Sequence, residues 1–506
     1  MKKAVILPAE YHDSVVLMRI AAEVKTVPGV LEAGLFMGTP ANHAILAAAD
    51  LVTAETGLAG PDDVIISLSA ADDTAADAGL AKARELLGAQ KKQAGTPGGA
   101  TAVTRPRTLD GAATMVPDAN LACLSIPGQY VAYEANRALE HAMNLFIFSD
   151  NVPLEDELAL KRTALAKGLL CMGPDCGTAY INGYGLGFFN AIPRGNVGLV
   201  ASSGTGLQAV TCGLALAGHG VSQGIGVGGR DLHPVVGGLM TIAALQALDQ
   251  DADTGIIVLI AKEPHPEVAP ALEKALASVR KPVVVCCLGL SGTLGGRPVA
   301  ETLDDAVDMT LAHLGSPSRE HGVAARKLAD ELRARHGERP ARLLGLYTGG
   351  TLAQEARHVL MQSGMAIDYG RSSAQSHAIL DLGDDEYTRG RPHPMIDPSL
   401  RNEMIERLTP HGETVILLFD LVLGRGSHPD PAPGLSRALK TARAAAEGAG
   451  GTLIALGSVV GAREDYQGFE RQTAILKEAG ACLLPTNCEA AKTAALLMKS
   501  TTAKPL

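Results

Sequence analysis

The 506-residue sequence predicts an α/β protein that combines a small N-terminal module with larger domains built on parallel sheets. Three observations support this prediction. Apolar strands alternate with helical segments along the chain, the strands after residue 195 are near-continuous runs of Val, Ile and Leu, and two similar strand–turn–helix units occur 146 positions apart. Unbroken apolar strands separated by helices are typical of parallel sheets that are covered on both faces.

Strand–helix alternation, broken by two polar stretches, divides the chain into six segments. They are an N-terminal α/β module (1–92), a linker (93–119), a shorter α/β segment (120–194), a flavodoxin-like domain (195–317), a charged helical linker (318–340) and a second flavodoxin-like domain (341–506). The two flavodoxin-like domains are predicted to be degenerate copies of one unit, because each begins with a strand, a Gly-Thr turn and an amphipathic helix.

Composition narrows the class of partner. Net charge is −10, aromatic residues make up 3% of the chain and Trp is absent, which argues against nucleic acid or an anionic membrane as a partner. No apolar stretch approaches the roughly 20 residues that cross a bilayer. The eight Cys include no C-x2-C pair, so neither a disulfide framework nor a metal site is expected. We therefore expect a cytoplasmic protein that binds a small anionic substrate.

The repeated turns are the leading candidates for a binding site. A small, hydroxyl-bearing turn at a helix N-terminus presents unpaired backbone N–H groups and the positive end of the helix dipole, which suits an anion. The alternative is that each Thr or Ser only caps its helix. Two such turns beside open-sheet crevices favour binding of phosphate or carboxylate, at one site or two. The residues are Ser202, Ser203, Gly204 and Thr205 in the first turn, and Thr348, Gly349, Gly350 and Thr351 in the second.

Three other segments carry candidate residues. Gly228 and Gly229 end a strand and border the same crevice, although glycines there often mark only a tight loop. A polar turn after a buried strand contains an Arg, which can bind an anion, and a His, which can transfer a proton. A second, more loop-like segment also contains Arg and His residues. The alternative for both is a turn stiffened by prolines. The residues are Gly424, Arg425, Gly426 and His428 in the first of these, and Arg389, Arg391 and His393 in the second.

Several motifs resemble those of the succinyl-CoA synthetases. Similarity to the α subunit lies in C-M-G-P-D-C from Cys171, V-G-L-V-A-S-S-G-T from Val197, G-V-G-G-R-D from Gly226 and K-P-V-V from Lys281. The block from residue 341 resembles the carboxy-terminal domain of the β subunit. The whole arrangement, with Y-H-D-S from Tyr11 and R-P-H-P from Arg391, resembles the FdrA family. This resemblance implies that residues 120–194 form a truncated CoA-binding-like Rossmann segment ahead of the two flavodoxin-like domains.

The departures from the synthetases are informative. Residues 290–299 contain no His where the synthetases carry their phosphorylated His, the ATP-grasp portion is absent, and the glycine fingerprint that receives CoA is missing upstream of Asn120. The resemblance therefore does not firmly imply any cofactor. It implies carbamoyl phosphate or an acyl phosphate as substrate, with CoA needed only if the chain is a ligase.

The FdrA resemblance implies a subunit of a hetero-oligomer, itself able to self-associate, that transfers a carbamoyl group between oxamate and oxalurate in allantoin breakdown. On this interpretation the turns hold phosphate and a carboxylate, Arg425 and Arg391 neutralise charge, and His428 carries the proton. Two alternatives remain open. One is an ADP-forming acyl-CoA synthetase of the succinate–CoA ligase type, and the other is a non-catalytic scaffold or anion-sensing subunit.

Overall fold

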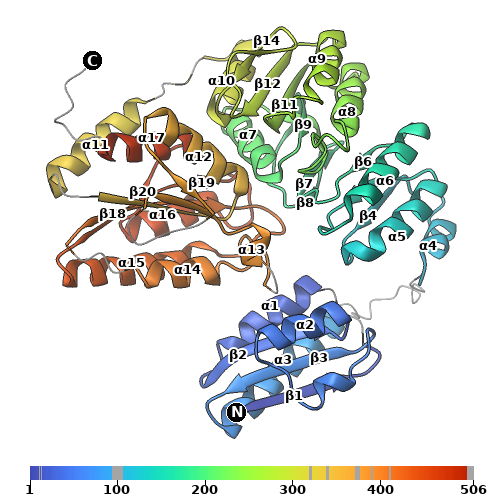
Figure 1. Ribbon diagram of the computed structural model, residues 1–506, viewed down its shortest axis with the longest axis vertical. Coiled ribbons are helices and arrows are strands. Elements are labelled where there is room, and N and C mark those ends of the chain that lie inside the picture. Colours follow the sequence, from blue (N-terminus) through green and yellow to red (C-terminus); the bar gives the residue numbers. More distant parts are fainter. Residues whose placement is uncertain are drawn as a thin grey trace. The chain divides into compact units, whose positions relative to one another are not determined.

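The computed structural model (Figure 1) describes residues 1–10, 12, 14–93, 106–317, 319, 322–337, 341–370, 376–388, 391–408 and 412–498. Tyr11, Asp13 and Arg389, which belong to the motifs named above, lie outside these residues. The α/β prediction is confirmed. The chain divides into two compact units, one of Met1–Thr104 with Gly383–Asp397 and one of Arg105–Leu382 with Pro398–Leu506. No helix among the described residues is long and apolar enough to span a membrane.

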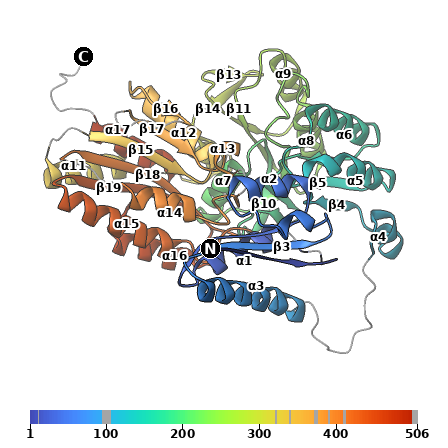
Figure 2. The same ribbon diagram turned by 60° about the horizontal axis from the view of Figure 1, so that its bottom comes forward.

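The N-terminal unit has a three-stranded antiparallel sheet in the order β1-β3-β2. Side chains of α1 and α3 form the core on one sheet face, and those of α2 pack on the other; Figure 2 shows α3 running along the sheet. The predicted alternation of strand and helix is found: β1 (Lys2–Leu7), α1 (Ser14–Lys25), β2 (Val30–Met37), α2 (Pro40–Ala48), the 3-10 turn η1 (Thr56–Leu58), β3 (Val64–Ala70) and α3 (Asp73–Gln93). The short α13 (Asp385–Thr388) also belongs to this unit.

The larger unit opens with a three-stranded parallel sheet in the order β4-β5-β6. Its elements are α4 (Leu109–Met115), β4 (Leu121–Leu124), α5 (Gly128–Glu140), β5 (Asn144–Ile147), α6 (Leu154–Ala166) and β6 (Cys171–Met172). Helix α4 lies in the stretch predicted as a linker, where the Thr108 hydroxyl caps it by accepting from the Gly111 N–H at 3.1 Å. The hairpin β7 (Thr178–Ile181) and β8 (Tyr184–Gly187) pairs with β10 of the next sheet, so the first sheet ends before residue 178 and not at 194.

The first repeat is an eight-stranded sheet in the order β13-β14-β12-β11-β9-β10-β7-β8. Its remaining elements are β9 (Arg194–Ala201), α7 (Gly204–Leu216), β10 (Val221–Gly226), α8 (Leu239–Gln250), β11 (Ile256–Lys262), α9 (Ala269–Ser278), β12 (Val283–Leu288), β13 (Thr293–Leu294), β14 (Arg297–Ala300) and α10 (Leu303–His313). The core strands β10, β9, β11 and β12 are parallel, as their unbroken apolar sequences predict.

The second repeat is a six-stranded, wholly parallel sheet in the order β16-β17-β15-β18-β19-β20. Its elements are β15 (Ala341–Tyr347), α12 (Gly350–Gln362), β16 (Asp368–Tyr369), β17 (Ala378–Asp381), α14 (Ser399–Glu406), β18 (Thr414–Val422), α15 (Ala432–Gly448), β19 (Thr452–Val460), α16 (Phe469–Glu478), β20 (Cys482–Leu483) and α17 (Asn487–Met498). The predicted linker helix α11 (Val323–His336) buries Ala325, Ala329 and Leu332, and its cap Gly322 donates to Glu489 of α17.

The two repeats share a strand order around their first strand. β9 lies between β10 and β11 with β12 beyond, and β15 lies between β17 and β18 with β19 beyond. The carboxyl ends of parallel strands meet at one edge of a sheet, which is where such folds bind ligands. The helices that follow the central strands, α7 and α12, therefore each start at the edge where a ligand is expected.

Candidate functional site

The two predicted turns lie against each other. The hydroxyls of Ser203 and Thr351 are hydrogen-bonded, and a Cβ placed on Gly349 would lie 3.0 Å from the Thr205 methyl group. The N-termini of α7 and α12 thus meet, and the positive ends of two helix dipoles converge on one place. The sequence left open whether the turns make one site or two, and the structure brings the two turns into contact.

Two more segments reach the first turn. Gly228 has a φ of +85°, and a Cβ there would lie 2.3 Å from the Pro174 carbonyl oxygen, so only Gly fits. A Cβ on Gly229 would lie 3.9 Å from the Ser202 carbonyl oxygen and 3.8 Å from a carboxylate oxygen of Asp175. Three of the four motifs that resemble the succinyl-CoA synthetase α subunit therefore converge at the start of α7.

Two residues of this convergence were not predicted as site residues. Asp175 is exposed and has a φ of +55°, a left-handed conformation that is uncommon outside Gly. Thr178 is buried, its hydroxyl makes no hydrogen bond within the described part of the chain, and a Cβ on Gly204 would lie 3.1 Å from it. A buried hydroxyl without a partner at a helix N-terminus can bind a ligand. The sequence could have indicated Asp175 and Thr178 only through their position in the turn between Cys171 and Thr178.

The second turn binds a carboxylate of the protein itself. Asp420, inside β18, accepts hydrogen bonds from the Thr348 N–H at 2.8 Å, from the Thr348 hydroxyl at 3.0 Å and from the Gly349 N–H at 2.7 Å. Thr348 and Gly349 were expected to hold a substrate anion. That expectation is corrected, because their donors are already taken, while Gly350 and Thr351 remain candidates. The missed signal was a single carboxylate in the otherwise apolar strand T-V-I-L-L-F-D-L-V.

Arg401 compensates the charge of Asp420. Its Nη1 donates to the carboxylate at 3.1 Å and to the Asp420 carbonyl at 2.6 Å, and both side chains are buried. Burial raises the pKa of Asp420 above its ordinary value, although Arg401 and the donors of the turn act in the opposite direction. This pair fixes the second turn against the centre of its sheet.

The loop after β18 is anchored to the segment before β9. Arg425 exchanges backbone hydrogen bonds with Phe189, at 2.6 and 3.2 Å, and its guanidinium lies 4.9 Å from the Tyr466 ring centroid. Gly424 and Gly426 have φ values of +112° and +83°, and a Cβ on Gly424 would lie 2.5 Å from the Phe189 carbonyl oxygen. Both glycines are thus required by the backbone, and the Arg425 side chain is exposed.

His428 sits in a turn that sets its tautomer. Its Nδ1 accepts the Asp430 backbone N–H at 3.1 Å, so the neutral ring carries its proton on Nε2. Arg471 donates twice to the Asp430 carboxylate, at 2.8 and 3.0 Å, and this lowers the pKa of Asp430. The neutral imidazole therefore offers its Nε2–H as a donor, while the lone pair of Nδ1 is occupied by the Asp430 N–H.

Arg391 belongs to the other compact unit. It lies in Gly383–Asp397, which groups with the N-terminal module and not with the unit that carries the turns. Nearby, burial lowers the pKa of His393 to about 4, and its Nδ1 accepts the Met395 N–H at 3.2 Å. His393 is therefore neutral at pH 7.

A buried ion cluster supports the glycine turn of the site. Lys161 of α6 donates to Glu157 at 2.8 Å, to Asp231 at 2.8 Å and to the Val227 carbonyl at 3.0 Å, and all three charged side chains are fully buried. Burial alone would lower the pKa of Lys161, but the charges of Asp231 and Glu157 raise it. The cluster holds the strand end that presents Gly228 and Gly229. Lys161 and Glu157 were not predicted from the sequence as residues that support the site.

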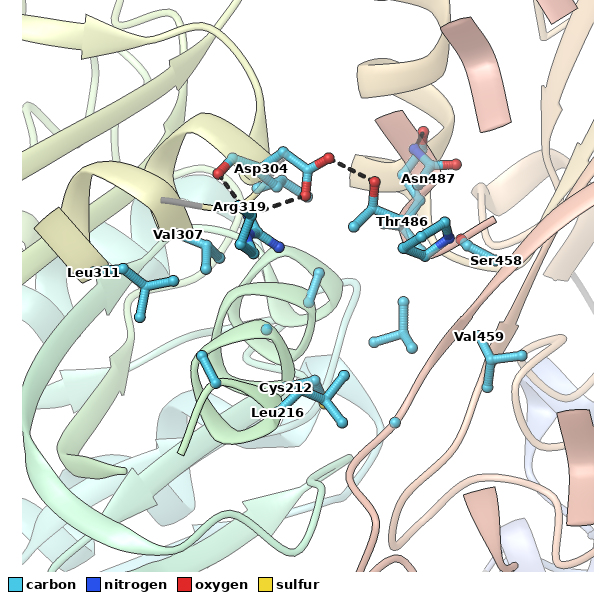
Figure 3. A pocket seen from close by; sticks show the side chains of 18 of the residues that line it. Cys212, Leu216, Asp304, Val307, Leu311, Arg319, Ser458, Val459, Thr486 and Asn487 are labelled. Carbon is cyan, nitrogen blue, oxygen red and sulfur yellow. Dashed lines mark hydrogen bonds and ion pairs between the residues drawn. The ribbon is translucent and has the colours of Figure 1, made fainter. Parts of the chain in front are cut away.

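A cavity of about 490 Å³ lies between the two repeats, apart from the turns (Figure 3). Helices α7 and α10 line one side, and the other side consists of α12, the end of β19 and the start of α17. The lining is mostly apolar, with a polar group around Asp304, Arg319, Glu355 and Asn487.

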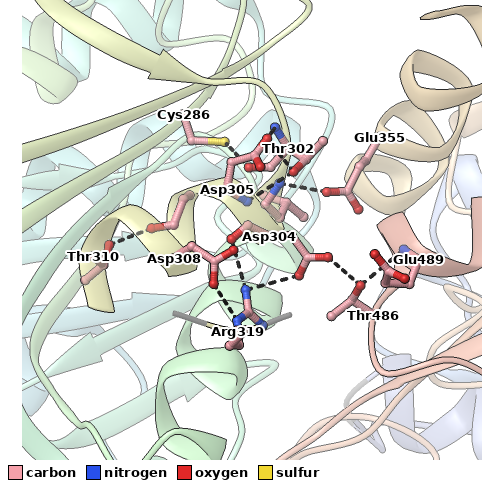
Figure 4. Close-up of polar contacts among 12 residues, drawn as sticks. Cys286, Thr302, Asp304, Asp305, Asp308, Thr310, Arg319, Glu355, Thr486 and Glu489 are labelled. Atoms are coloured by element: carbon pink, nitrogen blue, oxygen red, sulfur yellow. Dashed lines mark hydrogen bonds and ion pairs between the residues drawn. The ribbon is translucent and has the colours of Figure 1, made fainter. Parts of the chain in front are cut away.

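The polar group is tightly hydrogen-bonded (Figure 4). Asp304 accepts from the Thr486 hydroxyl at 2.5 Å and pairs with Arg319 at 3.4 Å. Glu355, which is buried, accepts from the Leu303 N–H at 2.7 Å and from the Asn487 amide at 2.8 Å. Burial and the charge of Asp304 raise the pKa of Glu355 to about 7.

This pKa predicts a pH dependence of stability. The folded state holds the Glu355 proton more tightly than the unfolded chain, so its contribution to stability is present below about pH 4.5 and is lost as the pH rises through about 7. The Glu355→Gln variant has no carboxyl group to titrate at this position. Between pH 4.5 and pH 8 the wild type should therefore lose up to about 3 kcal/mol of its free energy of unfolding relative to this variant. Denaturant unfolding at both pH values measures it. Glu464→Gln, at an exposed position, is the control, and equal pH profiles for Glu355→Gln and wild type would disprove the prediction.

Two parts of the chain match known protein families. A CoA-ligase family model matches residues 346–497, and a model described as "AllF, heavy metal-associated domain" matches residues 1–104. The uncharacterized protein YahF of Escherichia coli (strain K12) is 38% identical over 503 residues, which cover 95% of each chain. The chain belongs to the YahF family. This YahF family member also carries a segment similar to the α subunits of CoA ligases, which places it in the succinyl-CoA synthetase-like superfamily.

The ligase relatives cover only part of the YahF family member. The succinate–CoA ligase [ADP-forming] subunit alpha of Methanothermobacter thermautotrophicus is 27% identical over 189 residues, 36% of this chain and 61% of that one. The ADP-forming sulfoacetate-CoA ligase subunit SauD of Bilophila wadsworthia is 28% identical over 191 residues, 35% of this chain and 62% of that one.

The residues of the N-terminal module do not fit a heavy-metal site. Residues 1–104 contain no Cys, the soft ligand that heavy metals prefer. Within the described ranges, no group of three or more His, Cys, Asp or Glu side chains could hold a metal ion. The name of the matching family therefore does not extend to metal binding by this module.

Proposed function

We propose that this chain is a subunit of a cytoplasmic enzyme that transfers a carbonyl group carried as acyl or carbamoyl phosphate. The observation that carries the proposal is the meeting of α7 and α12 at Ser203 and Thr351. Two helix N-termini directed at one place favour a group with concentrated negative charge, as in a phosphate ester or anhydride.

The chain's own groups suit that substrate. We assign three sets of hydrogen-bond donors to the phosphate: the N–H groups at the start of α7, the Thr178 hydroxyl and the Thr205 hydroxyl. Gly350 and Thr351 approach it from the second repeat. Residues 290–299 form the short hairpin β13–β14 and contain no His, so a transfer that needs no phosphohistidine fits this chain best.

The specific reaction we propose follows the FdrA resemblance, between carbamoyl phosphate and oxamate. The oxamate nitrogen attacks the carbamoyl carbon, the bond from that carbon to the phosphate oxygen breaks, and oxalurate and phosphate leave after the nitrogen loses a proton. Arg425 is assigned to the oxamate carboxylate, since guanidinium pairs well with carboxylate. His428 is assigned as the proton carrier, and its Nδ1 accepts the proton once the Asp430 N–H has moved away from it. Other subunits complete the enzyme.

An acid–CoA ligase is the second candidate. It is favoured by the CoA-ligase match over residues 346–497 and by the ligase subunits that match the first repeat. A ligase would need partner subunits that supply the ATP-binding portion. CoA-dependent ATP hydrolysis by the assembled complex would identify it.

The test is phosphate release from carbamoyl phosphate by the complex purified through a tag on this chain. Parallel reactions contain oxamate, or ATP with CoA and a carboxylic acid. Release that requires oxamate, with formation of oxalurate, supports the carbamoyltransferase. ATP turnover that requires CoA supports the ligase instead. Absence of both, with partner subunits present, would leave the scaffold or anion-sensing role.

Substitution of the loop residues tests their roles. We expect Arg425→Ala and His428→Ala each to lower oxamate-dependent turnover by about 10²-fold, because each removes one charge or proton-transfer contribution. The Arg425 variant should raise the KM for oxamate, and the His428 variant should lower kcat. Arg463→Ala, at an exposed position nearby, is the control. Unchanged turnover in both loop variants would refute the assignment of this loop.

A further inference from the structure

We infer that the cavity between the two repeats is a second ligand site, which binds a small organic cation with a primary ammonium group and an apolar body. No residue of the paired turns lines this cavity, and the inference does not depend on the transfer reaction. Its volume of about 490 Å³ is within the range of about 300–1,000 Å³ found for small-molecule sites.

The polar end of the cavity offers acceptors that lack donors. Asn487 is buried, and its amide nitrogen donates to the Leu352 carbonyl at 2.9 Å and to Glu355 at 2.8 Å. These two bonds fix the orientation of the amide, and its oxygen makes no hydrogen bond among the described residues. The Ser458 hydroxyl is buried and likewise has no partner in the described part of the chain. Buried acceptors without donors are costly, and a ligand N–H would satisfy them.

The charge of this end favours a cation. Asp304 is paired with Arg319, whose guanidinium also binds Asp308 at 2.6 Å. Glu355 forms no ion pair within the described ranges, although it is buried beside Asp304. A buried carboxylate gains from a cation in contact with it, since attraction is strong where water is excluded. A ligand carboxylate would meet repulsion from the same group.

The remainder of the cavity sets the shape of the ligand. Its walls are aliphatic side chains from both repeats, which favour an apolar body attached to the ammonium group. They include Leu216, Val307, Leu311, Leu352, Val459 and Val460. Because the walls come from α7, α10, α12 and β19, an occupant would contact both repeats at once.

The experiment compares three probes of one shape, benzylamine, benzyl alcohol and benzoate, by isothermal titration of the full-length chain at pH 8. We expect benzylamine to bind saturably at one site and at least about tenfold more tightly than either of the others. Saturable binding of benzoate alone, equal binding of all three probes, or no saturable binding of benzylamine would overturn the inference.

Variants locate the binding. Glu355→Gln keeps the size of the side chain and removes its charge, so it should abolish the preference for benzylamine while leaving benzyl alcohol binding unchanged. Ser458→Ala should weaken benzylamine binding several-fold. Ser436→Ala removes a buried hydroxyl that does not line the cavity and should change nothing. Thermal melting confirms that each variant is folded, and benzylamine binding that is insensitive to both cavity variants would refute this site.

Discussion

Replacing Ser203 by Ala is expected to lower the proposed oxamate-dependent phosphate release by about 10²-fold, because the phosphate-binding N–H groups at the start of α7 lose their alignment. The Ser203 hydroxyl caps α7 by accepting the Gly206 N–H at 3.0 Å, and it also contacts the Thr351 hydroxyl. Its removal takes the cap from α7 and breaks the hydrogen bond between the two turns, so the substrate phosphate loses its alignment. Steady-state turnover of the tag-purified complex measures the effect.

A matched variant separates catalysis from stability. Thr108→Ala removes the same type of cap from α4, where the hydroxyl accepts the Gly111 N–H at 3.1 Å. Both variants should lose about 1 kcal/mol of stability, but only Ser203→Ala should lose turnover. A Ser203 variant that retains turnover within about twofold, with a normal complex, would show that the first turn holds no reacting group.

The largest loss of stability is expected from Lys161→Met. This change leaves Glu157 and Asp231 buried without the ammonium group that lies 2.8 Å from each of them. Removal of one member of a buried ion cluster costs about 3–5 kcal/mol. Arg230 still pairs with Glu157 at 2.8 Å, so the charge left without a cation is that of Asp231. Denaturant unfolding of the purified chain measures the change.

Lys167→Met is the control, since Lys167 is exposed at the C-terminal end of the same helix. It should change the free energy of unfolding by less than about 0.5 kcal/mol. The Lys161 variant should also weaken anion binding, because the cluster supports Gly228 and Gly229. A loss below about 1 kcal/mol for Lys161→Met would mean that the cluster does not stabilise this part of the fold.

Much of the fold was predictable because its signals are local. The apolar runs at β9, β15 and β18 predict buried parallel strands, and the Gly-Thr turns predict the starts of α7 and α12. The boundary after β6 was not predictable in the same way. Whether the hairpin β7–β8 joins the earlier or the later sheet depends on Tyr180 packing over Gly224, a contact between residues distant in the sequence.

The site was predictable only where its residues belong to local sequence patterns. Its turns carry recognisable residue types, but which donors stay available is decided by partners far along the chain. Asp420 occupies the donors of Thr348 and Gly349 from 72 and 71 positions away. Lys161 pairs with Asp231 across 70 positions. A single sequence does not show which residues pair across such distances. A lone charged residue within an apolar strand or helix face does indicate that it has a buried partner.

The most direct test of the central claim, that α7 and α12 form one anion site, is calorimetric titration of the chain with acetonylphosphonate. In this stable analogue a methylene group replaces the bridging oxygen of acetyl phosphate. We expect one binding site per chain, with an affinity that falls at least about tenfold in Ser203→Ala and in Thr351→Ala but not in Thr108→Ala. Binding at two independent sites, or binding that neither turn variant changes, would contradict it.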